Sequence, residues 1–400
     1  MEAGVEFIPS GTVTSPKGFR AGATYAGIKK KGPDLGILAS EVPCAVAGLL
    51  TTNRVKAAPV LLCQQRLAAG RARVVVANSG CANAFTGEQG LSDAVEMAQL
   101  AAEVVGVSPE EVLVASTGVI GQPLPMERLR DGMRQIKLSP DGGHELARAI
   151  MTTDTVPKEA AVSSHEGGFI IGGVAKGAGM IHPELATFLC FLATDAKVDI
   201  DFLKFSLRQA ADISFNMVSV DGDTSTNDTL LLLANGQAGG ETISSGTRQA
   251  EVFQEALSQL CIHLAKAIAR DGEGATKLIE VTVEGAPTLA EAKRVARTVT
   301  SSPLVKSAIH GNDPNWGRIV AAAGRSGVEV VEKKIDLYLD GICLVKAGRP
   351  QPFVREEAMR LLDKGEVSIV LNLNLGSASA TAWGCDLSEE YVTINSCYTT

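Results

Sequence analysis

The chain has 400 residues, with 37 Lys or Arg and 45 Asp or Glu, giving a formal net charge of −8. Hydrophobic residues make up 45% and charged residues 20%, so a large core can be buried and wholesale disorder is excluded. A nucleic-acid-binding protein carries a basic face, so the acidic balance argues against a nucleic acid as partner. Aromatic residues are only 4% while glycines number 41, which is typical of a metabolic enzyme with an aliphatic core.

At about 150 residues per domain, the length predicts two or three domains. The eight cysteines are dispersed and form no CxxC pair, and the five histidines include no HExxH pattern, so no metal site is expected. No signal peptide is recognisable at the start, which favours free thiols in a reducing, cytoplasmic location. The longest apolar runs, such as Ala45–Leu50 and Phe188–Ala193, are far shorter than the about 20 residues of a membrane helix. We therefore expect no membrane partner.

Two sequence patterns recur along the chain. Runs rich in β-branched residues predict strands, and apolar residues at the 3.6-residue period predict helices. In chain order they predict strand Arg73–Ala77, helix Leu91–Val105, strands Val112–Ser116, Phe169–Val174 and Phe188–Ala193, helix Asp201–Asn216, strand Leu230–Ala234, helix Arg248–Arg270, strand Leu278–Glu284, helix Leu289–Ile309, strand Val328–Leu339, helix Val354–Lys364 and strand Val367–Leu373. Because strands and helices come in blocks without strict alternation, we expect an α+β fold with mixed sheets packed with helices.

One stretch of the sequence contains a candidate catalytic nucleophile. A glycine-rich run, Gly172–Gly179, is followed by Pro-Glu-Leu-Ala-Thr, and an apolar strand begins directly after Thr187. The Thr187 hydroxyl could attack the carbonyl of Ala186, form an ester, and let water break the chain. The new N-terminal threonine would then hold a nucleophile and a base, since an α-amine has a pKa of about 7.7–8.0. From the residues alone, a glycine-rich hairpin leading into a buried strand is the more common structure.

Other polar segments favour structural interpretations. Asp221–Asn227 begins like a calcium loop, but Thr226 replaces the required glycine and Leu232 the required glutamate, so we predict a solvated, tight turn. Asp154 could cap a helix or contact a substrate, and the sequence leaves both open.

The segment Lys176–Thr187 resembles the processing motif of the ornithine acetyltransferase family, the glutamate N-acetyltransferases of arginine biosynthesis. Further blocks agree in the same order along the chain: Ser15–Phe19, Thr51–Val60, Asn78–Gly87, Ser116–Gly121, Met151–Thr155, Asp271–Lys277 and Gly311–Arg318. The likeness runs from about residue 10 to Thr400. It departs from the family pattern at Phe188, where Met is usual, and at Cys81, where Asn is usual.

This resemblance implies a self-processing enzyme whose nucleophile is an N-terminal threonine. Family members cut before the threonine that matches Thr187, giving an α chain of residues 1–186 and a β chain of residues 187–400. The two are expected to co-fold, with the active site at their junction. Thr187 would take acetyl from N-acetylornithine and pass it to glutamate in a ping-pong reaction. Such a covalent ester splits one hard transfer into two easier ones.

The resemblance also implies roles for individual residues. Thr117 and Gly118 match the oxyanion hole. The positions matching substrate-binding residues are Thr153, Lys176, Thr187, Glu273, Asn395 and Thr400. Lysine supplies a positive charge for an amino-acid carboxylate, and glutamate a negative charge for an amino end. No cofactor is implied; members differ in whether acetyl-CoA is also a donor, and no residue here decides that. Association of α and β chains into a heterotetramer of two α and two β is expected.

Two other functions use the same features. An N-terminal-threonine amidase or aminopeptidase would hand the acyl group to water, with the same nucleophile and oxyanion hole. A non-catalytic relative would keep the fold and bind a metabolite only.

Overall fold

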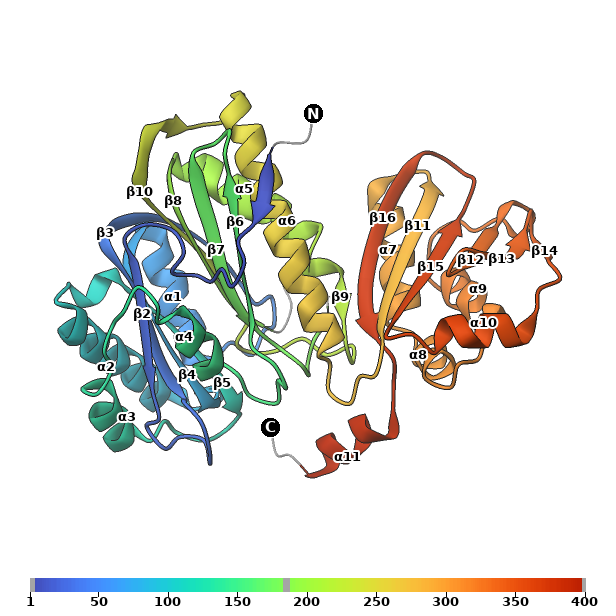
Figure 1. Cartoon of the computed structure of the whole chain (residues 1–400). Coiled ribbons are helices and arrows are strands. Elements are labelled where there is room, and N and C mark those ends of the chain that lie inside the picture. Colours follow the sequence, from blue (N-terminus) through green and yellow to red (C-terminus); the bar gives the residue numbers. More distant parts are fainter. Residues whose placement is uncertain (1–3, 183–187, 398–400) are drawn as a thin grey trace.

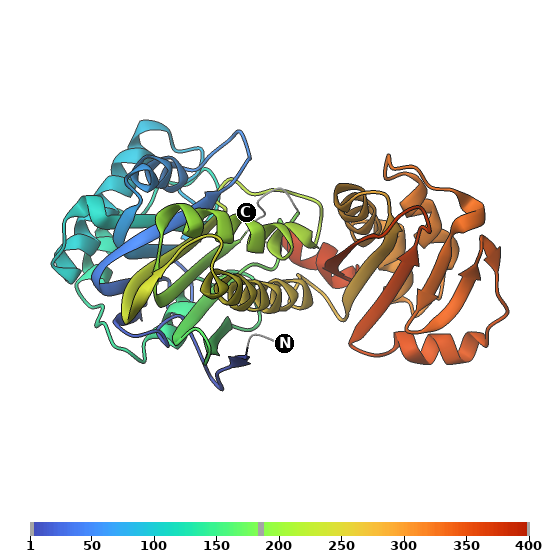
Figure 2. The same ribbon diagram turned by 90° about the horizontal axis from the view of Figure 1, so that it is seen from above.

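The computed structural model describes residues 4–182 and 188–397, and these form two lobes of unequal size (Figure 1). The larger lobe holds the chain up to about residue 275, and the smaller lobe the chain from there to about residue 386. The last helix, α11 (Glu389–Cys397), lies at the junction between the lobes (Figure 2). The lobes therefore divide near residue 276, whereas the predicted α and β chains divide at residue 186, inside the larger lobe.

The larger lobe is built on a mixed sheet that has nine strands within the described residues. Its order is β1 (Val5–Phe7), β6 (Lys158–Ser164), β7 (Phe169–Lys176), β8 (Leu189–Val198), β10 (Thr229–Ile243), β3 (Leu35–Leu50), β4 (Arg71–Cys81) and β5 (Val112–Val119), with β2 (Phe19–Thr24) paired to β3. The β8–β10 and β4–β5 pairs are parallel, and the other pairs are antiparallel.

Helices cover this sheet because each presents an apolar face to it. They are α1 (Ala58–Arg66), α2 (Gly87–Val105), α3 (Met126–Met133), α4 (Gly143–Ala149), α5 (Ile200–Asp212) and α6 (Arg248–Arg270). The long helix α6 packs on β6 and β7 and also against α5. Its buried residues, among them Phe253, Leu257 and Leu264, repeat at helical spacing.

The smaller lobe has a sheet in the order β14 (Arg349–Pro350), β13 (Ile342–Lys346), β12 (Asp336–Leu339), β15 (Glu366–Asn372), β11 (Leu278–Ala286), β16 (Ala378–Cys385) and β9 (Val218–Ser219). The short strand β9 comes from the larger lobe's part of the chain and pairs with β16. Helices α7 (Leu289–Thr300), α8 (Pro303–His310), α9 (Trp316–Gly324) and α10 (Arg355–Leu362) complete the lobe. Within the described residues, no helix is long and apolar enough to cross a membrane.

The α+β prediction is confirmed, and the predicted helix Arg248–Arg270 has the observed bounds of α6. The predicted helix Leu289–Ile309 is wrong in one respect. It is broken after Thr300, because Pro303 starts a new helix at a position that needs no N–H donor. The predicted strand Val328–Leu339 is wrong over its first part, since only Asp336–Leu339 is extended and paired.

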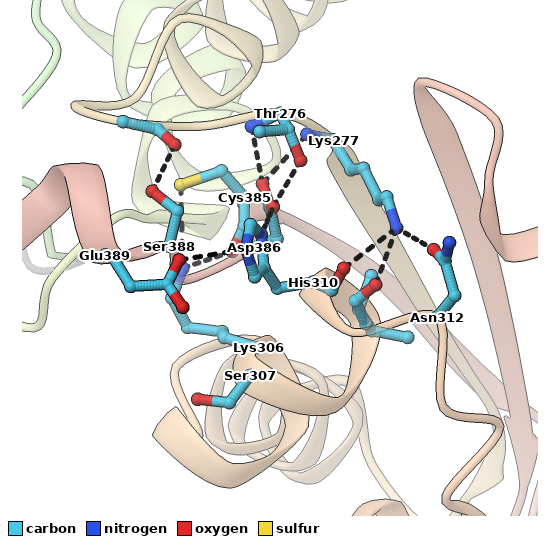
Figure 3. A network of polar contacts seen from close by, with 12 residues as sticks. Thr276, Lys277, Lys306, Ser307, His310, Asn312, Cys385, Asp386, Ser388 and Glu389 are labelled. Atoms are coloured by element: carbon cyan, nitrogen blue, oxygen red, sulfur yellow. Dashed lines mark hydrogen bonds and ion pairs between the residues drawn. The ribbon is translucent and has the colours of Figure 1, made fainter.

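A polar network joins the two lobes where the chain passes between them (Figure 3). The carboxylate of Asp386 accepts hydrogen bonds from the backbone N–H groups of Thr276 and Lys277, both at 2.8 Å. His310 Nδ1 lies 2.7 Å from the same carboxylate. Two residues further on, Ser388 Oγ donates to Gly274 O at 2.6 Å. The outgoing and returning segments are thus bound to each other, and this fixes where α11 begins.

The glycines before the predicted cleavage point serve packing more than bending. Gly172 and Gly173 lie in strand β7, and neither has a positive φ. A Cβ on Gly172 would lie 2.1 Å from Thr12 O, and one on Gly173 would lie 2.6 Å from a methyl group of Leu192. These two glycines therefore do not bend the backbone: they let neighbouring segments approach the strand.

We expect Gly172→Ala to destabilise the fold by about 1–3 kcal/mol, because the new methyl group must push away a backbone carbonyl. Urea unfolding of the purified protein measures this free energy. Gly324→Ala is the matched control, since a Cβ there meets nothing within 4 Å and that glycine lies in helix α9. Equal stability of the two variants would contradict the packing argument.

Candidate active site

A cavity of about 230 Å³ lies in the larger lobe where the ends of β5 and β7 meet α11. Six residues expected at the site line it: Thr117, Gly118, Thr153, Lys176, Glu273 and Asn395. These residues are up to 278 positions apart in sequence (395 − 117), so the fold brings them together. Ala186, Thr187 and Thr400 lie outside the described residues.

Thr117 and Gly118 stand at the end of β5, where its register with β4 becomes irregular. Gly118 has a φ of +129°, and a Cβ on it would lie 2.4 Å from the carbonyl carbon of Gly80, so only glycine fits. Lys176 Nζ donates to Thr117 Oγ1 at 3.2 Å. The Thr117 oxygen thus accepts from lysine, which leaves the hydroxyl proton available for a second acceptor.

A buried lysine, Lys158, connects the segments that form one wall of the cavity. The side chain of Lys158 is 1% exposed, and its Nζ lies 2.6 Å from both Asp154 Oδ1 and Asp271 Oδ2. Asp271 follows helix α6 directly and also accepts from the backbone N–H of Thr155 at 3.0 Å. One ammonium group therefore joins β6, the end of α6 and the segment between residues 152 and 155.

Asp154 extends this arrangement to the cavity. Its carboxylate accepts from the N–H of Thr152 at 2.9 Å and of Gly177 at 2.7 Å. Burial alone would raise the pKa of Asp154, but the ammonium groups of Lys176 and Lys158 outweigh it and lower the pKa to about 2. The sequence left open whether Asp154 caps a helix or contacts a substrate. In the structure it instead forms a buried ion pair that positions the cavity wall.

Lys176 is the cation of the cavity. Burial lowers the pKa of Lys176, and the nearby carboxylate of Asp154 opposes this shift. The carboxylate thus favours the charged form of Lys176, and a charged ammonium group with little water around it attracts an anion more strongly than a solvated lysine does.

Glu273 connects the cavity to the C-terminal helix. Its backbone N–H donates to Ala178 O at 2.8 Å, and its carboxylate accepts from Asn395 Nδ2, also at 2.8 Å. A Cβ on Gly179 would lie 2.5 Å from the Glu273 carboxylate. With Tyr391 also lining the cavity, α11 closes one side of the site.

The segment Asp221–Asp228 also belongs to the site, which the sequence interpretation missed. Ser225, Thr226 and Asn227 are buried and line the cavity, so the prediction of a solvated turn is wrong for this half of the segment. Asn227 Nδ2 donates to Ala82 O at 2.6 Å and to Ser116 O at 2.8 Å. A usable signal was present: a polar run stands directly before an apolar strand.

Asp228 is a buried carboxylate at the start of β10. Neither side-chain oxygen accepts a hydrogen bond of good geometry within the described part of the chain, although the backbone N–H of Phe188 and the hydroxyl of Thr51 lie close enough to favour its charged form. Burial raises the pKa of Asp228 well above its usual range. The next residue, Thr229, donates its N–H to Phe188 O at 3.0 Å, which places Asp228 beside the first described residue after the predicted cleavage point.

Lys158→Met should destabilise the protein by about 3–5 kcal/mol, because it leaves two buried carboxylates without their cation. Urea unfolding at neutral pH measures the loss. Lys346→Met removes an ion pair of similar length, 2.8 Å to Asp336, but from a side chain that is 54% exposed. Its effect should be much smaller. Comparable losses in the two variants would contradict a structural role for the buried cluster.

Asp228→Asn should stabilise the fold at neutral pH. The unfolded chain releases this proton near pH 4, whereas the folded chain holds it to higher pH, so the carboxyl group costs stability as pH rises above about 4. The cost levels off above the raised pKa. The difference in Tm between variant and wild type should therefore grow with pH from 4 upward. Asp131→Asn, at a side chain 76% exposed, should show no such trend.

Comparison with known proteins places the chain in a family. The model of the ArgJ family matches residues 20–400. The arginine biosynthesis bifunctional protein ArgJ of Dehalococcoides mccartyi is 53% identical, with 100% of both chains covered. The protein of that name from Symbiobacterium thermophilum is 54% identical over 98% of this chain and 99% of its own. A crystal structure of the Bacillus halodurans ArgJ protein aligns with a TM-score of 0.50 at 46% identity, covering 51% of this chain and 96% of that one. The chain belongs to the ArgJ family.

Proposed function

We propose that this protein is a self-cleaving glutamate N-acetyltransferase of arginine biosynthesis, which moves acetyl from N-acetylornithine to glutamate. Full-length relatives named for arginine biosynthesis support the pathway. The observation that carries the proposal is the convergence on one cavity of two candidate oxyanion donors, a buried cation and a carboxylate: Thr117, Gly118, Lys176 and Glu273. Strand β8 begins at Leu189, shortly after the predicted cleavage point. Leu189 pairs with Thr229, which directly follows the polar segment that lines the cavity.

Cleavage proceeds by attack of Thr187 Oγ on the carbonyl carbon of Ala186. The peptide C–N bond breaks, the acyl group is carried as an ester, and water then releases the carboxylate of Ala186. Thr187 keeps a free α-amine, which acts as the base for its own hydroxyl. The alignment with the Bacillus halodurans structure covers 96% of that chain but only 51% of this one. This supports a family whose members consist of two pieces.

The acetyl group then passes through the enzyme in two steps. The α-amine takes the Thr187 hydroxyl proton while Oγ attacks the acetyl carbonyl of N-acetylornithine. The proton then passes to the departing nitrogen as the C–N bond breaks, and ornithine leaves as an amine. The amine of glutamate attacks the acetyl ester in the second step and returns the proton to Thr187. Thr117 Oγ and the Gly118 N–H stabilise both oxyanions. A donor of this kind is worth about 10²–10³ in kcat.

One site serves both amino acids, because donor and acceptor share a carboxylate. Lys176 binds that carboxylate, while Glu273 and Asn395 bind the amino end of the ornithine side chain and Thr153 and Thr400 add hydrogen bonds. Since a buried carboxylate stabilises its charge, Lys176 stays an effective anion partner in the cavity.

The proposal extends to the setting of the enzyme. It works in the cytoplasm without a bound cofactor or metal, as two α and two β chains, and accepts acetyl-CoA as a second acetyl donor.

Thr187→Ala tests the mechanism. Wild-type protein should give two masses, for residues 1–186 and 187–400, and should form N-acetylglutamate from N-acetylornithine and glutamate. The variant should stay as one 41.7 kDa chain and be inactive. Thr242→Ala, an exposed threonine in β10, should be cut and active.

Product analysis separates transfer from hydrolysis. If acetate exceeds N-acetylglutamate at saturating glutamate, the protein is an amidase and the transferase proposal fails. It also fails if the uncut Thr187→Ala chain retains full activity.

A further inference from the structure

A second cavity, of about 520 Å³, opens beside helix α7 in the smaller lobe. Four cationic side chains line it, together with His182: Lys293, Arg294, Arg297 and Arg325. No Asp or Glu is among its described lining residues. In a chain with a net charge of −8, so many positive charges around one hollow indicate a site for a multiply charged anion.

The helix geometry gathers these charges. Lys293 and Arg297 are four residues apart, so they lie on one face of α7. The buried residues of α7, such as Val295 and Val299, lie on the face packed against the sheet. Arg325 follows α9 and donates to Thr298 O on α7 at 3.5 Å. Two helices thus present cations to a single space.

The positive charges around this cavity repel one another, and carboxylates of the described residues neutralise only some of them. Lys293 forms an ion pair with Asp212. Neither Arg294 nor Arg325 has a carboxylate partner within the described residues. An anion bound between these guanidinium groups would remove the repulsion, and phosphate suits them because a guanidinium binds two of its oxygens at once.

The basic cavity adjoins the active site along the chain. His182 lines the basic cavity, and Met180 lines the active cavity. Their Cα atoms are two residues apart, hence at most about 7 Å. The segment is fixed in place, because Val220 N–H donates to Ile181 O at 2.8 Å and His182 Nδ1 lies 3.1 Å from Ser219 Oγ. The two cavities are therefore close to each other at this segment.

We infer that the basic cavity binds the phosphate groups of acetyl-CoA, so that the pantetheine arm passes residues 180–182 and delivers the thioester to the active cavity. This inference rests on the proposed function and assigns its second donor a site of its own. Thr187 Oγ attacks the thioester carbonyl, the C–S bond breaks, and the proton taken from Oγ leaves on the CoA thiol. N-acetylornithine carries no phosphate, so it has no use for this cavity.

The double variant Arg294→Gln/Arg325→Gln tests the assignment by comparing the two donors. The KM for acetyl-CoA should rise at least about tenfold, while the KM for N-acetylornithine changes less than about twofold. Arg20→Gln/Arg134→Gln removes the same charge from exposed ion pairs of the larger lobe and should change neither KM. Intact masses of all variants confirm normal cleavage.

A second arm uses adenosine 3′,5′-bisphosphate, which carries phosphates but no acyl group. It should compete with acetyl-CoA, leave the N-acetylornithine reaction unaffected, and lose potency in the Arg294→Gln/Arg325→Gln protein. An unchanged KM for acetyl-CoA in that protein overturns the inference and leaves the N-acetylornithine reaction standing. The inference is also overturned if wild-type protein binds the bisphosphate at these arginines but transfers acetyl only from N-acetylornithine. Failure of wild type with both donors would instead refute the proposed function.

Discussion

The ammonium group of Lys158 is the contact on which the active cavity depends most. It is enclosed by Asp154 and Asp271 at 2.6 Å each, with almost no exposed surface. A buried charge is tolerated only when it is paired and hydrogen-bonded, and here the pairing carboxylates also accept backbone N–H groups. Because Asp154 binds Gly177, the backbone just after Lys176 is fixed to this cluster. The position of the cavity's cation is thereby set by an ion-pair cluster that is itself buried.

The other side of the cavity is set by the junction between the lobes. Asp386 ties the returning chain to the outgoing chain, and Ser388 adds a contact to Gly274, so α11 starts at a fixed point. From there Asn395 reaches the Glu273 carboxylate. The smaller lobe thus contributes to the site indirectly: the chain returns from it beside the point where it entered and then continues into α11.

The periodicity of apolar residues predicted those helices and strands whose apolar pattern is regular. Helix α6 has a long, regular apolar stripe, and its bounds were predicted correctly. Strand β3 was not predicted, because Glu41 and Pro43 interrupt its apolar run while its partners on both sides hold it extended. The pairing of Lys158 with Asp271 spans 113 residues, and no spacing rule reveals it. The polar run before β10 looked solvated, since composition alone does not distinguish a polar segment in water from one folded around a cavity.

The sheet explains how a cut chain can remain one protein. Strand β7 ends at Lys176 and β8 starts at Leu189, and the two are antiparallel neighbours, so the segment between them connects adjacent strand ends. Scission after Ala186 would remove no ladder hydrogen bond of either strand. β8 would still pair with β7 on one side and with β10 on the other. The predicted α and β chains would therefore share one continuous sheet and one core, and the β chain would be held from Phe188 onward, whose carbonyl accepts from the N–H of Thr229.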